Sequence, residues 1–272
     1  MLPDYHVHTR YSPDSAMEPE EVIRAAISAG ISDICFTEHM DLGHHMETFN
    51  RVPDFSEIDK TIAELRIKYN DIHIGKGIEV GYILDTTKQT AEVLANQSFD
   101  YVLLSTHCVD GIDCYLPESK RGRDKMTAYK RYLETLYESV VDRNLLEYYD
   151  CISHIGYIAK CNHYEDNTFS YELFSELFDK ILHKIIDRGK GIEVNTSGIN
   201  RAGHVLPHPS IIRRYKELGG KIITIGSDAH KAENVGSNIA EAVGILKKAG
   251  FDEFTIFRNR VPHFVKLENV VC

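Results

Sequence analysis

The chain has 272 residues, 43% of them hydrophobic, and a formal net charge of −10 at pH 7. This composition is typical of a folded globular protein and excludes a largely disordered chain. The acidic excess disfavours a surface that binds nucleic-acid phosphates, since such binding needs clustered Lys and Arg. A small substrate, especially one that carries cationic groups, fits this charge better.

Short apolar runs alternate with longer amphipathic stretches along the chain. The runs predict seven strands, at residues 4–8, 32–39, 72–81, 100–107, 148–154, 191–197 and 221–230. The stretches predict helices at residues 18–30, 55–70, 87–97, 124–143, 171–189, 209–219 and 238–250. Such alternation, with nearly continuous apolar strands, implies a parallel sheet covered by helices. Because no Pro-, Ser- or Gly-rich linker divides the chain, we expect one domain over residues 1–272.

Nearly every predicted strand ends in a residue type that binds metal ions. A GxGxxG fingerprint is absent, so a dinucleotide-binding sheet is not indicated. In a TIM-like barrel the carboxyl ends of all strands ring one mouth, and the loops there carry the chemistry. The sequence therefore predicts an α/β protein with a TIM-like barrel, whose mouth gathers His6, His8, His39, Glu79, His107, His154, Asp228 and His230.

Two pairs of metal-binding residue types have a spacing of two residues. His6 and His8 lie on one predicted strand, so their imidazoles point to the same face and can bind one ion. Asp228 and His230 repeat this spacing after the last strand. An isolated pair would be equally compatible with surface histidines on an edge strand. Two pairs at opposite ends of the chain favour a metal site.

Glu79 follows an apolar strand, where burial of an unpaired carboxylate is costly. With two oxygens it is a candidate bridging ligand between two cations. The alternative is a partly exposed Glu79 that pairs with Lys76. His107 and His154 likewise each end an apolar run, and either one alone would be compatible with a hydrogen-bonded core histidine.

The six cysteines are scattered, form no CxxC pair and belong to a chain too large to need disulfides for stability, so we expect reduced thiols in a cytoplasmic protein. The sequence opens without a signal-peptide pattern and contains no apolar run long enough to span a membrane. We therefore expect no membrane partner. The oligomeric state is not indicated.

At this point the chain resembles the PHP (polymerase and histidinol phosphatase) superfamily. The resemblance is carried, in family order, by HVHT, TEH, GIEV, STH, ISHIG and GSDAH, which span residues 6 to 230. The segments DYHVHTRYSPDS, ICFTEHMD, STHCVDGID and EVNTSG are similar to the histidinol-phosphate phosphatase branch. The resemblance implies a distorted (β/α)7 barrel and a site for two or three divalent ions.

The resemblance also implies how the ligands divide. His6, His8, Asp228 and the bridging Glu79 would hold one ion, and Glu79, His107 and His154 the second. His39, His230 and Asp14 would hold the third, with Asp14 at a position where some relatives carry histidine. This exchange leaves zinc, iron and manganese open. Glu79, Asp228 and His230 are the candidate catalytic residues.

The implied activity is hydrolysis of L-histidinol phosphate in histidine biosynthesis, by a hydroxide held between two metals that attacks phosphorus. Arg201 and Lys160, after the sixth and fifth strands, are candidate phosphate ligands, although either is equally compatible with a solvated loop charge.

Three alternatives stay open. The first is a phosphoesterase of the same family acting on a nucleotide or sugar phosphate. The second, a polymerase-associated exonuclease, is disfavoured by the absence of a basic, aromatic surface. The third is a metal-binding protein without turnover.

Two further features have no assigned role. It is open whether residues 261–272 cover the other end of the barrel. Eight histidines remain unassigned, of which His73 and His183 are expected to be structural or exposed and the loop residues His44, His45, His204 and His208 are candidates for substrate contacts; the other two are His163 and His263.

Overall fold

The computed structural model describes residues 1–161 and 163–269. Its main sheet has seven parallel strands in the order β1-β2-β3-β4-β7-β8-β9, which confirms the predicted strand–helix alternation. These strands are β1 Pro3–Val7, β2 Asp33–Met40, β3 His73–Gly81, β4 Tyr101–Ser105, β7 Cys151–Ile152, β8 Gly191–Asn195 and β9 Ile223–Gly226. The fifth predicted strand is the most shortened, since β7 pairs with each neighbour through two residues.

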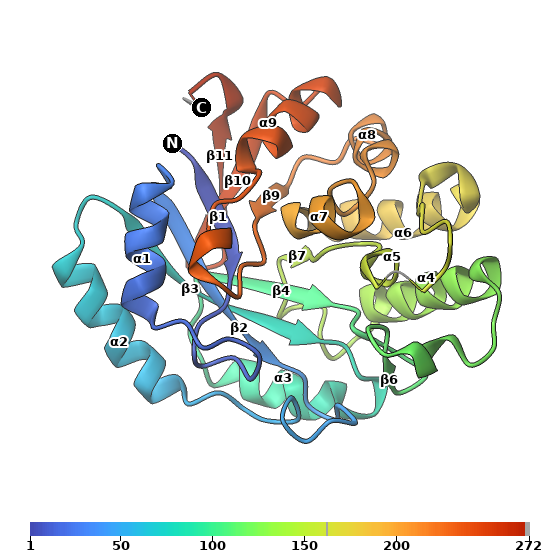
Figure 1. The fold of residues 1–272 in the computed structure, drawn as a ribbon, viewed down its shortest axis with the longest axis horizontal. Coiled ribbons are helices and arrows are strands. Elements are labelled where there is room, and N and C mark those ends of the chain that lie inside the picture. The colour runs from blue at the N-terminus through green and yellow to red at the C-terminus, as the bar shows by residue number, and fades with distance from the viewer. Residues whose placement is uncertain (162, 270–272) are drawn as a thin grey trace.

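The two edges of this sheet meet at their carboxyl ends. The amide of Asp228, just after β9, donates to the carbonyl oxygen of His6 in β1 at 2.7 Å, and the amide of His8 donates to the carbonyl oxygen of Ala229 at 3.0 Å. These bonds join the first strand to the segment that follows the last. The sheet therefore curls into a distorted barrel, as predicted, with the helices around its outside (Figure 1).

Several of the covering helices have residues at their ends that stabilise helix termini. Asp54 and Asp124 accept hydrogen bonds from backbone amides in the first turn of α2 and α4, as N-caps do. Gly30 lies just beyond α1 with a φ of 75°, a conformation that glycine adopts without strain. The helices are α1 Pro19–Ser28, α2 Phe55–Lys68, α3 Thr87–Ala95, α4 Lys125–Val141, α5 Tyr157–Lys160, α6 Ser175–Asp187, α7 Ile199–Ala202, α8 Pro209–Glu217 and α9 Ile239–Lys248.

One predicted helix, at residues 171–189, is interrupted. Residues 171–173 form a single 3-10 turn, and Phe174 leaves helical geometry with a φ of −146° before α6 begins at Ser175. None of the helices in the described part of the chain is both long enough and apolar enough to cross a bilayer.

A small hairpin after β4 was not predicted. Its strands, β5 Cys108–Val109 and β6 Ile112–Asp113, are joined by Asp110 and Gly111, both with positive φ. An Asp-Gly pair between apolar residues is a strong signal for a two-residue hairpin turn. The hairpin is tied to α4, because the Asp110 carboxylate lies 2.6 Å from a guanidinium nitrogen of Arg123 and 2.9 Å from one of Arg131.

The C-terminal segment covers the amino-terminal end of the barrel. β10 Glu253–Arg258 and β11 Val261–Lys266 form an antiparallel hairpin beside β1 and β9 (Figure 1). Arg258 pairs with Asp33 at the start of β2, and the Asn259 amide donates to Asp100 just before β4. The open question about residues 261–272 is therefore answered for residues 261–269, while residues 270–272 lie outside the described part.

Candidate metal centre

The metal-type residues expected at the barrel mouth come together there. His6, His39 and Glu79 lie in β1, β2 and β3, and the others follow strands by one to a few residues. A cavity of about 670 Å³ opens at this end of the barrel. Seven of the nine candidate ligands line the cavity, namely Asp14, His39, Glu79, His107, His154, Asp228 and His230. His6 and His8 are fully buried next to them.

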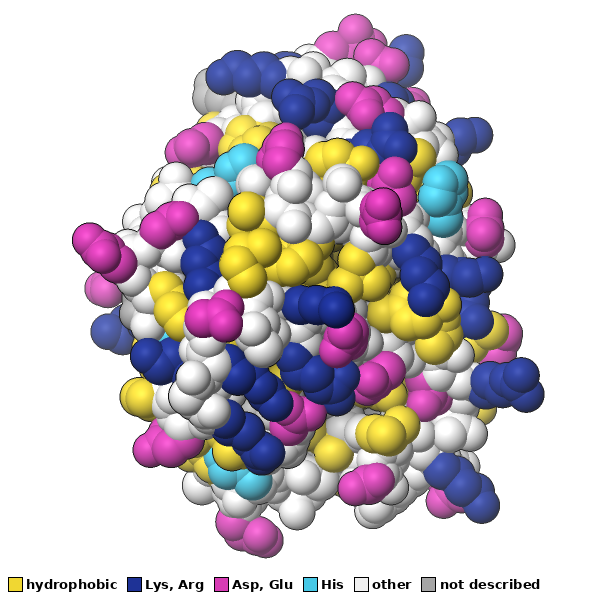
Figure 2. Space-filling view, turned by 90° about the vertical axis from the view of Figure 1, so that its right-hand side faces the viewer, with side chains coloured by type: hydrophobic (Ala, Val, Ile, Leu, Met, Phe, Trp, Pro, Cys, Tyr) yellow, Lys and Arg dark blue, Asp and Glu magenta, His cyan; other side chains and the backbone are white. Residues whose placement is uncertain are grey.

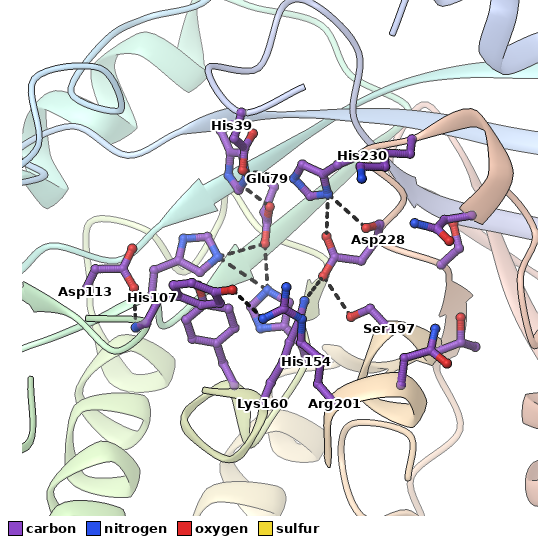
Figure 3. A pocket seen from close by; sticks show the side chains of 18 of the residues that line it. His39, Glu79, His107, Asp113, His154, Lys160, Ser197, Arg201, Asp228 and His230 are labelled. Carbon is purple, nitrogen blue, oxygen red and sulfur yellow. Dashed lines mark hydrogen bonds and ion pairs between the residues drawn. The ribbon is translucent and has the colours of Figure 1, made fainter. Parts of the chain in front are cut away.

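Glu79 is at the centre of the cluster (Figure 3). Its Oε1 lies 2.8 Å from Nε2 of His154 and 3.1 Å from Nε2 of His107. Its Oε2 lies 3.1 Å from Nδ1 of His39, 3.2 Å from Nε2 of His6 and 3.4 Å from Nε2 of His8. The two oxygens thus face two different sets of imidazoles, which is the arrangement a bridging carboxylate needs. The alternative pairing with Lys76 is wrong, because the Lys76 ammonium lies 2.5 Å from Asp59.

Two further carboxylates complete the cluster. Asp228 Oδ1 lies 3.5 Å from Nε2 of His8 and 3.6 Å from Nδ1 of His230. Asp228 has a φ of 55°, an uncommon conformation for a residue with a side chain and one that often occurs at functional sites. Asp14 Oδ2 lies 3.1 Å from Nε2 of His230 and 3.5 Å from Nε2 of His39.

Three groups in this cluster have ligand atoms close enough to share one ion: His6, His8 and Asp228; His39, Glu79 and His107; and His8, His39 and His230. The first group contains three of the ligands that the family resemblance implies for one ion. Each of the other two groups combines His39 with at least one residue that the resemblance assigns to a different ion, so side-chain geometry by itself allows more than one division of the ligands.

Several buried polar atoms of the cluster are in positions where they could bind cations. Within the described residues, Glu79 Oε2, His39 Nδ1 and His230 Nε2 are buried and have no hydrogen-bond partner. Nε2 of His6 and Nε2 of His8 also face each other at 3.1 Å. Buried polar atoms without partners are costly. A cation that accepts lone pairs from imidazole and carboxylate would remove this cost, so the donor set fits divalent metal ions.

Burial and neighbouring charges set the protonation of the cluster. Burial, together with His230 and His39, lowers the pKa of His8 to about 3, so His8 is neutral and keeps a lone pair for a metal. Burial raises the pKa of a carboxyl group, yet His6, His39 and His107 hold the pKa of Glu79 well below its usual value. Glu79 is therefore ionised.

Sequence reasoning missed a set of residues that orient the imidazoles. Oε1 of Glu193, in β8, lies 2.7 Å from Nδ1 of His6. Oε2 of Glu193 accepts a hydrogen bond from the His154 amide at 2.9 Å. Asp41 lies 2.7 Å from Nδ1 of His107. Such contacts to the second ring nitrogen select the tautomer that leaves Nε2 free. Glu193 had a sequence signal, since it is a carboxylate in an apolar strand, as Glu79 is.

The two predicted phosphate ligands both line the cavity (Figure 3). The Lys160 ammonium, on α5, lies 2.7 Å from Asp228 Oδ2. Arg201, on α7, is exposed and lies over the ring of Tyr115, with 5.1 Å from guanidinium carbon to ring centroid. Both cations are therefore beside the cluster. Their role toward phosphate stays a prediction.

Of the eight unassigned histidines, His44 lines the cavity. It also lies near His45 and Cys108, but both of its ring nitrogens are within hydrogen-bonding distance of other protein groups. His208 accepts a hydrogen bond from the Ser210 amide and caps α8, while His183 is exposed as expected.

Known proteins resemble this chain over most of its length. A probable histidinol-phosphatase from Clostridium acetobutylicum is 33% identical over 244 residues, which cover 89% of this chain and 92% of the relative. A histidinol-phosphatase from Lactococcus lactis subsp. lactis is 31% identical over 257 residues, which cover 93% of each chain.

A solved structure and a family model extend this likeness. The crystal structure of histidinol phosphate phosphatase from Lactococcus lactis subsp. lactis, complexed with zinc, L-histidinol and phosphate, matches with a TM-score of 0.88 and 28% identity. The match covers 96% of this chain and 98% of that one. The model of the PHP domain matches residues 4–197. The family resemblance predicted from the motifs is thereby confirmed, and the chain belongs to the PHP domain family.

Proposed function

We propose that this protein is a metal-dependent phosphomonoesterase that hydrolyses L-histidinol phosphate to L-histidinol and phosphate. The observation that carries the proposal is the position of Glu79, whose two oxygens face two sets of histidines beside an open cavity. The relatives named as histidinol-phosphatases, and the similar structure complexed with L-histidinol and phosphate, support the choice of substrate.

Two or three divalent cations, zinc, iron or manganese, are part of the proposal, and zinc in the similar structure supports it. The ligands would be His6, His8, Asp14, His39, Glu79, His107, His154, Asp228 and His230. Bound cations supply an activated water for attack on phosphorus and neutralise charge on the phosphate oxygens.

The protein's own side chains would bind the phosphate and orient the metal ligands. Lys160 and Arg201 face the cavity from α5 and α7, where they would bind the phosphate dianion opposite the cluster. Asp228 keeps Lys160 in place through the 2.7 Å contact. Glu193 and Asp41 hold the rings of His6 and His107, so these imidazoles need little rearrangement to bind an ion.

The same proposal includes three broader expectations: one PHP-type domain over residues 1–272, a cytoplasmic location, and a small phosphate ester as partner. Among the residues that the structure describes, the strands and helices share one hydrophobic core, which supports the domain assignment. On the face around α4 and α6, Lys and Arg side chains lie interspersed with Asp and Glu (Figure 2), which supports a small-molecule partner.

The test measures phosphate release from L-histidinol phosphate, p-nitrophenyl phosphate, AMP and a sugar phosphate, with the protein's metals counted by elemental analysis. We expect two or three metals per chain and a strong preference for L-histidinol phosphate. Chelation should abolish turnover, and added zinc or manganese should restore it. Weak and even activity across the panel would instead favour the alternative, a phosphoesterase for other small esters.

A further inference from the structure

The cavity beside the histidine cluster has a second polar group, formed by Asp113 and His44. Asp113 ends β6 and His44 follows β2, and both side chains line the cavity. In Figure 3 Asp113 lies next to His107, on the opposite side of the site from Asp228. The Asp113 side chain is 13% exposed, so it is largely buried but open to the cavity.

Polar contacts hold both the Asp113 side chain and the hairpin that carries it. Asp113 lies in the hairpin whose turn residue, Asp110, is held by Arg123 and Arg131 from α4. Its own Oδ1 accepts a hydrogen bond from the Tyr115 amide at 2.8 Å. A carboxylate fixed in this way has a defined position before any ligand arrives, which lowers the entropic cost of binding.

Burial raises the pKa of Asp113, but the hydrogen bond from His44 and the nearby charge of His107 lower it below its usual value, so the carboxylate is ionised. Nδ1 of His44 accepts a hydrogen bond from the Met46 amide at 3.1 Å, so a neutral His44 ring carries its proton on Nε2. This Nε2 lies 3.3 Å from Asp113 Oδ2, where it donates to the carboxylate. In the described part of the chain, Asp113 forms an ion pair with neither Lys nor Arg. A carboxylate accepts about four hydrogen bonds, so Asp113 has room for a cationic ligand.

The surroundings of Asp113 are apolar and aromatic. Met46, Phe49, Tyr115 and Leu116 line the cavity with it. The only other carboxylate that lines the described cavity outside the histidine cluster and its Asp41 partner is Glu233, which is exposed and accompanied by Asn234 and Lys231. A largely buried carboxylate attracts a cation more strongly than an exposed one, because water screens the exposed charge.

We propose that Asp113 binds the ammonium group of the substrate's alcohol portion and thereby selects phosphate esters with an amine near the phosphate, while the apolar wall around it receives the imidazole ring. The inference rests on the proposed function. L-histidinol phosphate has its phosphate, amine and ring on one short chain. A phosphate held near Lys160 and the cluster would leave the other two groups facing the Asp113 end of the cavity.

The test compares Asp113→Asn with the wild-type protein on three phosphate esters. These are L-histidinol phosphate, imidazolylpropyl phosphate, which keeps the ring but lacks the amine, and p-nitrophenyl phosphate. Asn keeps the shape of Asp113 and can still accept from the Tyr115 amide. We expect kcat/KM for L-histidinol phosphate to fall about tenfold to a hundredfold, the usual value of a hydrogen bond to a charged group, mainly through KM. Activity on the other two esters should stay unchanged, which also shows that the variant is folded.

Glu233→Gln is the matched control, because it neutralises an exposed carboxylate that lines the same cavity and should leave all three activities unchanged. An equal loss on both imidazole esters in Asp113→Asn would overturn the assignment to the amine. So would a selective loss in Glu233→Gln, since it would place the amine at Glu233. A wild-type protein without preference for L-histidinol phosphate would contradict the proposed function itself, and the inference would fall with it.

Discussion

Both ends of the barrel carry carboxylates at strand ends, but these carboxylates face different partners. At the carboxyl end, Glu79 faces five imidazoles, and Asp228 faces imidazoles through Oδ1 and the Lys160 ammonium through Oδ2. At the amino end, Asp33 pairs with Arg258, Asp100 with Arg66, and Asp150 with Arg260. Burial alone therefore does not distinguish the two ends. What distinguishes them is that several imidazoles gather around the carboxylates at the carboxyl end, whereas each of these amino-end carboxylates has an arginine partner. Of these three, and among the described residues, only Asp33 also lies within ion-pair distance of an imidazole, that of His73.

The difference matters because the two partners titrate differently. A guanidinium is always protonated in proteins, so the arginine of each amino-end pair keeps its charge and offers no lone pair to a metal. An imidazole can lose its proton near neutral pH and then offers a lone pair to a metal. The amino end is therefore suited to stability, and the carboxyl end to metal binding.

The largest effect is expected where the carboxyl end loses its central carboxylate. Glu79→Gln removes a charge that five imidazoles face. Bound metal and activity should be lost together, with kcat/KM reduced about a thousandfold or more, because metal ions contribute several kcal/mol to transition-state stabilisation. Elemental analysis and phosphate release measure both. Glu92→Gln, an exposed position on α3, is the control. Wild-type turnover in Glu79→Gln would exclude its bridging role.

An intermediate effect is expected from Glu193, which contacts histidines proposed to bind metal but does not line the cavity. Glu193→Gln weakens the contact at 2.7 Å with Nδ1 of His6. Metal affinity should fall about tenfold to a hundredfold, as is typical for partners of metal-ligating histidines, and added metal should restore much of the activity. Metal titration of the chelator-treated protein measures this affinity. The control is Glu176→Gln, an exposed position on α6, which should bind metal with the same affinity as the wild type. A metal-titration curve of Glu193→Gln equal to that of the wild type would contradict the role of Glu193 in positioning His6.

The smallest effect on activity is expected at the amino end. Arg258→Met leaves the buried Asp33 carboxylate without its guanidinium partner. The free energy of unfolding should fall by about 2 kcal/mol, less than for a fully buried pair because Arg258 is partly exposed. Urea unfolding measures this loss, and phosphate release below the transition should not change. Lys266→Met, which removes an exposed lysine from the same hairpin, is the control. A loss of activity without a loss of stability would contradict the division between the two ends.

The sequence predicted more of the carboxyl end than of the amino end. Metal-type residues at strand ends, such as His39 and Glu79, indicated a barrel mouth because histidines and carboxylates rarely recur there by chance. Asp33, Asp100 and Asp150 also lie at strand ends, but their arginine partners come from distant segments with no local pattern. The covering role of β10 and β11 was for this reason left open.

Asp113 shows the same limit at the carboxyl end. The Asp-Gly turn before it was readable as a hairpin, but nothing local says that this hairpin lies over the cavity beside His44. The alternation of strands and helices and the order of the motifs were determined by the sequence alone, because both depend on local patterns of residues. Which oxygen of Glu79 faces which imidazole, and which carboxylates meet histidine rather than arginine, was decided by the tertiary structure, because barrel closure brings together residues far apart in the chain.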